Sequence, residues 1–145
     1  MNNTFIPSFD YTQKKWYIID AKNQTLGRLS SKVARILQGK DKINFYPSLD
    51  LGNYIIIINV EKICVSGNKE KQKVYYRHSG RPGGMKYETL KSLRVRLPKR
   101  ILEKSIKGML PKNSLGRKMF TRLKLFKGMD YLHIAQNPEK INIYD

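Results

Sequence analysis

The chain is poor in cysteine and has no long apolar segment. Its 145 residues include one cysteine, Cys64, which excludes a disulfide within the chain and indicates a reducing compartment. No apolar run approaches the roughly 20 residues that a membrane-spanning helix needs. Residues 1–15 have neither the charged and then apolar order of a signal peptide nor the Arg-rich amphipathic pattern of a transit peptide. We therefore expect a protein that works in the compartment where it is made, or one whose presequence has been removed.

Acidic residues are also scarce. Eleven Asp and Glu stand against 29 Lys and Arg, which gives a formal net charge of +18 and a pI near 10.1. The excess is concentrated, because residues 69–127 carry nineteen cations and three acids. A solvated face usually interleaves both signs, so this surplus favours a polyanionic partner that relieves the self-repulsion. Nucleic acid and an anionic membrane surface are the two candidates.

Motifs of catalysis and metal binding are missing as well. The turn after the first expected strand has one glycine, Gly27, and matches neither a dinucleotide fingerprint nor a P-loop. Cys64, His78 and His133 lack the clustered spacing of metal ligands. Asp20 follows a strand, where α/β enzymes place functional groups, but a turn or cap role is far more common for such a residue. We predict no catalytic residue, metal or cofactor; an enzyme acting on RNA or on a nucleotide is the alternative.

The first recognisable pattern along the chain is that of a strand, a helix and a second strand. Residues 15–20 are expected to form a strand, and residues 54–60 form a second one that is apolar on both alternating sets, as in a sheet covered on both sides. Between them, apolar residues recur at helical spacing, with Thr25 as the N-cap and Gly39 at the end. This order predicts a right-handed crossover between parallel strands. Residues 62–67 are a candidate for a further short strand.

A glycine-rich segment follows, and it is the first candidate binding site. The stretch YYRHSGRPGGMK, residues 75–86, interleaves aromatic side chains, cations and glycines. We expect a strand at 74–76 and a loop around the glycines. Tyr75 and Tyr76 are able to stack on unpaired bases, although one of them is expected to face the core. The cations and the histidine expected to contact RNA phosphates here are Arg77, His78, Arg81 and Lys86.

The second candidate site is the stretch KGMLPKNSLGRKMF, residues 107–120. We expect a helix that starts at Pro98 and ends at Pro111, and a second helix capped by Ser114. The apolar side chains should be buried, namely Met109, Leu115 and Met119 at the corner and Leu123 further along the second helix. A helix N-terminus beside Lys and Arg favours anions, so the corner should dock on RNA. The expected contacts are Lys107, Lys112, Arg117 and Lys118, followed by Arg122 and Lys124 on the outside of the second helix.

Four motifs occur in order along the chain and carry a resemblance: WYIIDAKNQTLGRLSSKVARIL, VSGNKEKQKVYYRHSGRPGGMK, KGMLPKNSLGRKMF and LHIAQNP. Together they resemble the large-subunit ribosomal protein thirteen family of bacterial type, from about Trp16 to Ile143. The resemblance implies a three-layer α/β fold, with a small, mostly parallel sheet, helices on both faces, and basic loop and helical extensions. It also implies a structural protein that binds large-subunit rRNA through phosphate contacts, lies beside other large-subunit proteins and joins the subunit early.

The resemblance also bears on organisation and location. We expect one domain over 1–145, with an N-terminal extension at 1–14 and a C-terminal tail at 128–145. The YYRHSGRPGGMK motif is similar to the cyanobacterial and plastid branch, and abundant Lys, Ile and Asn indicate an A+T-rich gene. A ribosome in the chloroplast stroma is therefore favoured over one in a bacterial cytoplasm. Asn113-Ser114 stands where the family usually has Gly-Pro, and Asn tolerates a left-handed turn.

A peripheral membrane protein is the remaining alternative. Such a protein would show a basic amphipathic helix with Trp or Phe on its apolar face. The only tryptophan, Trp16, lies in an expected strand. We therefore predict neither a membrane partner nor a small-molecule substrate.

Overall fold

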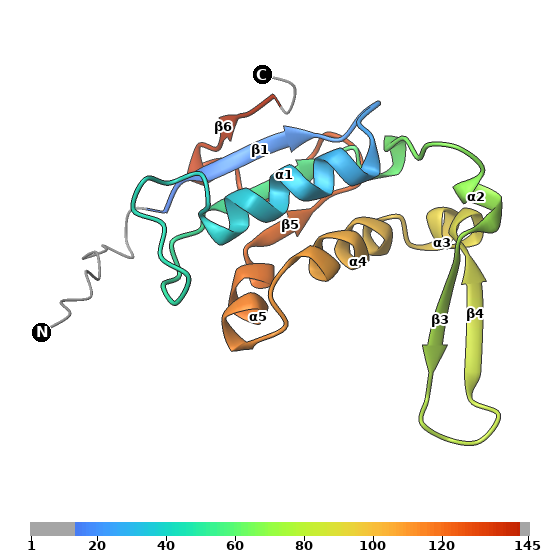
Figure 1. The fold of residues 1–145 in the computed structure, drawn as a ribbon. Coiled ribbons are helices and arrows are strands. Elements are labelled where there is room, and N and C mark those ends of the chain that lie inside the picture. The colour runs from blue at the N-terminus through green and yellow to red at the C-terminus, as the bar shows by residue number, and fades with distance from the viewer. Residues whose placement is uncertain (1–13, 143–145) are drawn as a thin grey trace, which may run out of the picture.

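The centre of the molecule is a four-stranded sheet (Figure 1). The structure is a computed structural model that describes residues 14–142. The strand order is β5-β2-β1-β6, and β1 pairs in parallel with β2 and β6, as β2 does with β5. An α/β fold with a mostly parallel sheet is thereby confirmed. The strands of this sheet are β1 (Trp16–Asp20), β2 (Tyr54–Ile58), β5 (Leu123–Leu125) and β6 (Glu139–Lys140).

Helix α1 (Leu26–Gln38) connects β1 to β2. Thr25 occupies the N-cap position with extended backbone, but its side chain makes no capping bond. Gly39 ends the helix with a φ of 78°, a conformation that glycine adopts without steric penalty. The parallel pairing that a crossover requires, and both ends of the expected helix, are confirmed.

The central strand β2 is buried on both faces. Ile55 and Ile57 point toward α1, whose apolar stripe packs on them in one core cluster. Ile56 points the opposite way, because side chains alternate along a strand, and it is equally buried. On that face the segment after β5 covers the sheet: the His133 ring lies 5.3 Å from that of Trp16. This segment contains the 3-10 helix η2 (Ile134–Gln136), so the helical cover is long on the α1 face and short on the other.

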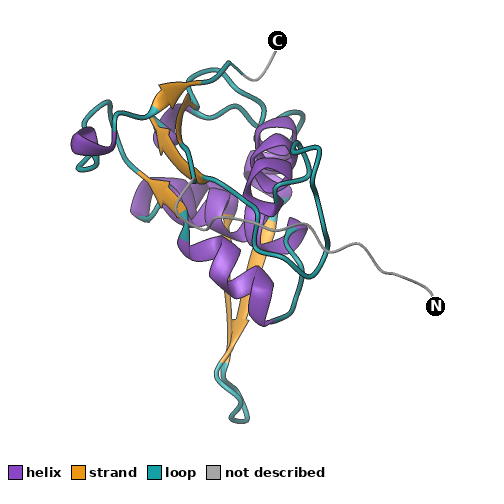
Figure 2. Cartoon of the chain, turned by 90° about the vertical axis from the view of Figure 1, so that its left-hand side faces the viewer, coloured by secondary structure: helices purple, strands orange, loops and turns teal. Residues whose placement is uncertain are grey.

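The remaining elements form the basic extensions. Helix α4 packs beside α1, and the β3–β4 hairpin projects away from the sheet, as Figures 1 and 2 show. Among the described residues, no helix is long and apolar enough to cross a membrane. These elements are η1 (Val60–Lys62), α2 (Lys69–Gln72), β3 (Val74–His78), β4 (Met85–Thr89), α3 (Leu90–Arg96), α4 (Lys99–Met109) and α5 (Ser114–Thr121).

Three expectations about these elements are wrong. Residues 62–67 form no strand, because only a single bridge joins Cys64 to Thr25. Leu123 lies in β5 and not in α5, because β2 offers an edge on which residues 123–125 pair. Met109 is 42% exposed, since it ends α4 on the solvent side, whereas Leu115 is half-buried and Met119 is buried as expected.

The two methionines of the corner provide a matched test of this core. Met119→Ala should lower the free energy of unfolding by about 2–5 kcal/mol, because it leaves a cavity among enclosed side chains. Met109→Ala should change it by about 0.5 kcal/mol or less, because Met109 already faces water. Urea unfolding followed by circular dichroism measures both values. Equal losses from the two substitutions would contradict the assigned burial.

Candidate nucleic-acid interface

The hairpin has one cationic face and one aromatic face. Tyr76 pairs with Tyr87 across the two strands, and Arg77 pairs with Lys86. Because side chains alternate, the two cations share one face and the two tyrosines share the other. Like charges directly opposite each other destabilise a strand pair. Within residues 14–142 neither cation forms an ion pair with an acid, so no direct contact offsets this repulsion in the free protein.

The hairpin tip is a compact glycine turn. Gly80 and Gly83 have φ values of 87° and 70°, in the left-handed region that favours glycine. The Gly80 N–H donates to Nδ1 of His78 at 2.9 Å, so this ring nitrogen has a role within the turn. Arg81 is exposed at the tip. The turn therefore presents a guanidinium group at the part of the hairpin furthest from the core.

Acidic residues hold the base of the hairpin. Glu88 accepts hydrogen bonds from Arg96, the shorter at 2.6 Å, and these bonds lower the pKa of Glu88 and raise that of Arg96. Arg94 forms an ion pair of 2.6 Å with Glu70 and also donates to the carbonyl of Ile63. Glu88 and Glu70, two of the three acids in residues 69–127, thus pair with arginines at the base of the hairpin. The tip of the hairpin therefore remains positively charged.

Only one of the two neighbouring tyrosines faces inward. Tyr75 is half-buried and packs against the core cluster, and this burial raises its pKa. The ammonium group of Lys104, from α4, lies 4.4 Å from the centroid of its ring. Tyr76 is 67% exposed. The expectation that one tyrosine of the pair faces the core is confirmed, and Tyr75 is that residue.

The corner between α4 and α5 is built by a side-chain cap and a close backbone approach. Oδ1 of Asn113 accepts a hydrogen bond of 2.8 Å from the Gly116 N–H, so Asn113 and not Ser114 is the cap. Asn113 has extended backbone, with φ at −113°, so the corner does not use the left-handed conformation that Asn tolerates. A Cβ atom at position 116 would overlap the carbonyl oxygen of Pro111. Gly116 is therefore required for this tight junction.

Four cations surround the corner, and none is neutralised by an acid within the described part of the chain. All four are exposed: Lys107, Lys112, Arg117 and Lys118. Three of them border a hollow of about 500 Å³ whose floor includes Leu110 and Phe120. The ammonium group of Lys107 lies 5.9 Å from the Phe120 ring. The predicted arrangement of apolar residues below and cations above is thus present, apart from Met109.

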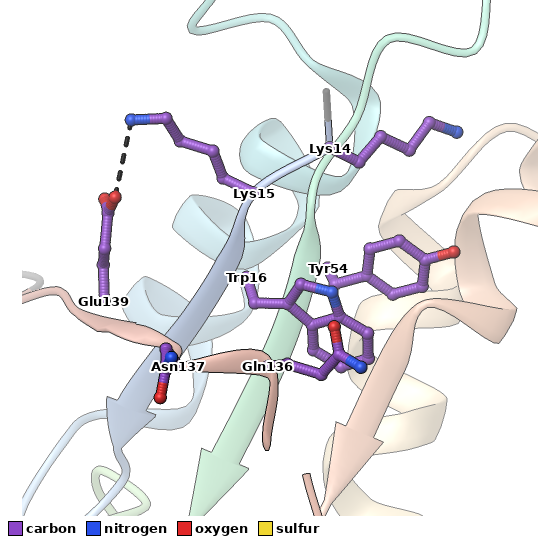
Figure 3. A pocket seen from close by; sticks show the side chains of 7 residues that line it. All are labelled: Lys14, Lys15, Trp16, Tyr54, Gln136, Asn137 and Glu139. Carbon is purple, nitrogen blue, oxygen red and sulfur yellow. Dashed lines mark hydrogen bonds and ion pairs between the residues drawn. The ribbon is translucent and has the colours of Figure 1, made fainter. Parts of the chain in front are cut away.

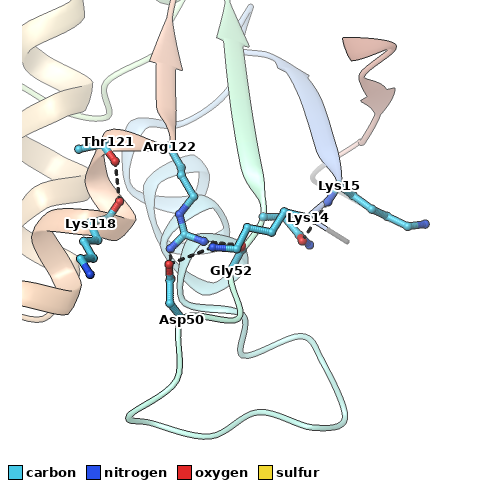
Figure 4. A network of polar contacts seen from close by, with 8 residues as sticks. Lys14, Lys15, Asp50, Gly52, Lys118, Thr121 and Arg122 are labelled. Atoms are coloured by element: carbon cyan, nitrogen blue, oxygen red, sulfur yellow. Dashed lines mark hydrogen bonds and ion pairs between the residues drawn. The ribbon is translucent and has the colours of Figure 1, made fainter. Parts of the chain in front are cut away.

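Arg122 does not lie on the outside as predicted. It is 4% exposed and donates to the carbonyl of Gly52 and to the carboxylate of Asp50 (Figure 4). Asp50 also accepts a hydrogen bond of 2.9 Å from Lys14. Arg122 follows α5 directly, and the chain turns there into the sheet, so its side chain points inward. Lys124 is half-buried on β5.

The surroundings of this ion pair remain strongly positive. The pKa of Lys42 is lowered, first by burial and then by the charges of Lys14, Arg122 and Lys15. One carboxylate thus lies among several cations. Asp50 joins the loop before β2 to the end of α5 and to the residues before β1, and it belongs to the fold rather than to an exposed binding surface.

The exposed cations of the hairpin and those of the corner form two groups at opposite ends of α4. The hairpin lies beside the start of this helix, and α5 follows its end (Figure 1). Eleven helical residues span about 16 Å. The two groups are therefore positioned by one rigid element. The hairpin group is Arg77, Arg81 and Lys86, and the corner group is Lys107, Lys112, Arg117 and Lys118.

A further hollow, of about 550 Å³, lies at the end of the sheet where β1 and β2 begin (Figure 3). The rings of Trp16 and Tyr54 stack there with centroids 4.3 Å apart, and Lys15 forms an ion pair of 3.5 Å with Glu139. These contacts join the start of β1 to β2 and to β6. Their geometry gives this hollow a structural role in closing the C-terminal segment on the sheet.

Asp20 has the position best suited to catalysis, but its carboxylate makes hydrogen bonds that stabilise the fold. Oδ1 of Asp20 accepts from the Lys22 N–H at 2.9 Å and from Nδ2 of Asn59 at 2.9 Å. The turn role expected for Asp20 is confirmed. No group of three potential metal ligands was found among the residues that the structure describes.

A parallel α/β core with two attached basic groups that have no acidic partner among residues 14–142 defines a candidate polyanion-binding protein. The family model described as "Ribosomal protein L13" matches residues 14–131, so this chain belongs to the ribosomal protein L13 family. A relative from a strain of Prochlorococcus marinus, named "Large ribosomal subunit protein uL13", is 57% identical over 143 residues. Proteins of the same name from Synechococcus sp. (strain WH7803) and Gloeothece citriformis (strain PCC 7424) are each 55% identical. Each alignment covers 99% of this chain and 95% of the relative.

The buried ion pair yields a test with a matched control. Arg122→Ala should lower the free energy of unfolding by about 1.5–3 kcal/mol, because Asp50 and the Gly52 carbonyl lose their enclosed donor while Asp50 keeps its contact with Lys14. Lys118→Ala removes an exposed cation four residues earlier and should change it by about 0.5 kcal/mol or less. Denaturant unfolding of both variants measures the difference. If Arg122→Ala were as stable as Lys118→Ala, the contact with Asp50 would not support the fold.

Proposed function

We propose that this protein is a structural constituent of the large ribosomal subunit and that it binds large-subunit rRNA mainly through phosphate contacts. The observation that carries the proposal is the set of seven exposed hairpin and corner cations, none of which has an acidic partner within residues 14–142. The names of the cyanobacterial relatives support the same role. His78 and Lys124 are further candidate contacts, and Arg122 acts through the fold.

The geometry suits phosphate recognition. The guanidinium and ammonium groups of both basic sites are donors that pair with phosphate oxygens, and they reach out from short, well-fixed elements. Because the two groups lie at opposite ends of α4, one protein is able to bind two segments of RNA backbone. Bridging two segments favours a compact RNA fold, and on this ground we propose that the protein supports early assembly of the subunit beside neighbouring ribosomal proteins.

The proposed location is the ribosome of the chloroplast stroma, with the bacterial cytoplasm as the alternative. Relatives 55–57% identical come from cyanobacteria, which supports the branch indicated by the YYRHSGRPGGMK motif. The abundance of Lys, Ile and Asn, which indicates an A+T-rich gene, favours the plastid.

The role proposed is not enzymatic. Asp20 is engaged in a turn and in a bond to Asn59, which leaves its carboxylate in a structural position. A membrane-binding role is disfavoured because the apolar faces of α4 and α5 pack into the core, where Ile101, Ile106 and Met119 are buried.

Sedimentation tests the proposed function directly. The native protein should cofractionate with the large subunit on a sucrose gradient of organelle or cell extract, since its cations are neutralised by the subunit's rRNA. After the extract is treated with ribonuclease, the protein should leave these fractions. A pool that sediments as free protein or with membranes before the treatment would contradict the proposal.

The salt dependence of binding tests the phosphate contacts of the corner. The affinity for large-subunit rRNA should fall steeply with salt, and the triple variant Lys112→Ala, Arg117→Ala, Lys118→Ala should reduce the log–log slope by about 2–3. Substitution of the same three residues by Glu should weaken binding further, because like charges then meet phosphate.

The control for this experiment removes three exposed cations elsewhere. Lys22, Lys40 and Lys62 are exposed and lie outside both basic groups. Their replacement by Ala lowers the net charge equally but should change the slope less. Filter binding or fluorescence anisotropy across a salt series measures each slope. The same decrease for both triples would mean that net charge alone, and not the corner, determines binding.

A further inference from the structure

The aromatic face of the hairpin is an exposed apolar surface on an otherwise cationic projection. Tyr76, Met85 and Tyr87 are 67%, 58% and 77% exposed. Strand register and alternation place all three on the face opposite Arg77 and Lys86. We refer to Tyr76, Met85 and Tyr87 as the platform. Large apolar side chains that gather on one exposed face indicate a binding surface rather than chance exposure.

We propose that the platform stacks on unpaired bases of the large-subunit rRNA. This inference rests on the proposed function and deepens it, since the contacts named in that proposal involve phosphates alone. Two tyrosine rings on one face of a hairpin present flat apolar surfaces at a fixed spacing. Base–aromatic stacking is a main means by which proteins recognise unpaired RNA.

The positive charge around the platform favours nucleic acid as the ligand that binds there. In residues 74–89 the only acid is Glu88, which already accepts from Arg96 and Ser92 at the base of the hairpin. The same segment carries Arg77, Arg81 and Lys86. An apolar protein surface docked on the platform would desolvate the edge of this cationic hairpin, whereas a nucleotide offers both a stacking face and a phosphate.

The structure also separates the two kinds of contact in space. The cations lie on one face and at the tip, and the rings lie on the other face. A hairpin of this kind fits between a phosphate backbone on one side and unstacked bases on the other. Tyr75 has no part in the platform, because it is half-buried against the core with Lys104 over its ring.

The test compares variants of the platform in binding to protein-free large-subunit rRNA transcribed in vitro. Tyr76→Leu with Tyr87→Leu retains apolar bulk and every cation but removes both rings. Binding should weaken by at least about tenfold, because a stacked base contributes roughly a factor of five or more. The log–log salt slope should not change, since no phosphate contact is lost. The double Phe variant should bind within about twofold of the parent, and the control Leu132→Ala, at an exposed apolar residue outside the hairpin, should bind as the parent does.

Each result decides the proposal. If the double Leu variant binds this rRNA like the parent, the platform does not stack on bases. If it also fails to enter the subunit while binding free rRNA normally, the platform contacts a neighbouring ribosomal protein, which equally overturns the proposal. A parent protein that does not bind rRNA at all would refute the proposed function, so the two failures are distinguishable.

A fluorescence measurement covers the case in which the double Leu variant does not fold. Trp16→Phe with Tyr76→Trp places the only tryptophan on the platform. Stacking on a base should quench its emission when the same rRNA is added. Trp16→Phe with Leu132→Trp serves as the control and should retain its emission. Emission at position 76 that is unchanged at saturating rRNA would overturn the proposal.

Discussion

The enclosure of β2 on both faces is the constraint on which the rest of the structure depends. Ile55, Ile56 and Ile57 are all buried, so the strand needs apolar cover on each side. Helix α1 provides one cover, and the segment after β5 provides the other. Because α1 is itself apolar on the side away from solvent, α4 packs beside it and fixes the positions of the hairpin and of α5. The exposed cations are thus located by a core that contains none of them.

The molecule separates folding from binding within single short segments. At the corner, Met119 is enclosed while Lys118 and Arg117 face water. At the hairpin, Tyr75 faces the body and Tyr76 faces away. Acidic residues follow the same division, since Glu70, Glu88 and Asp50 all pair with arginines that support the fold. Few carboxylates are therefore left near the exposed cations to compete with a polyanion.

Sequence patterns predicted the long elements well. The first two strands and α1 combine apolar periodicity with clear ends, and the structure confirms them. The strands β5 and β6 contain three and two residues, too few for a period to appear, and they form because the sheet has edges on which to pair. The second strand of the hairpin was missed, although the glycines between two tyrosine-containing stretches are a usable signal.

Individual site residues were predicted less evenly, for physical reasons. Charge indicated correctly that the hairpin and corner cations are exposed, because unpaired cations avoid the interior. The same reasoning failed for Arg122, whose partners Asp50 and Gly52 are about 70 residues away and known only once the chain is folded. Asn113 and Ser114 are both good caps, and only the backbone geometry identifies the one that is used.

Gly116 has a consequence for how sequence variation in this family relates to function. The residue carries no charge and no side chain, yet any Cβ at this position meets the carbonyl of Pro111. The lack of a Cβ atom at Gly116 thus permits the tight junction that positions Lys112 and Arg117. Among relatives, we expect Lys and Arg to replace each other at positions 112 and 117, because both bind phosphate. At position 116, we expect almost no residue other than glycine. A survey that ranks residues by charge would therefore overlook Gly116, although this residue determines where the neighbouring cations lie.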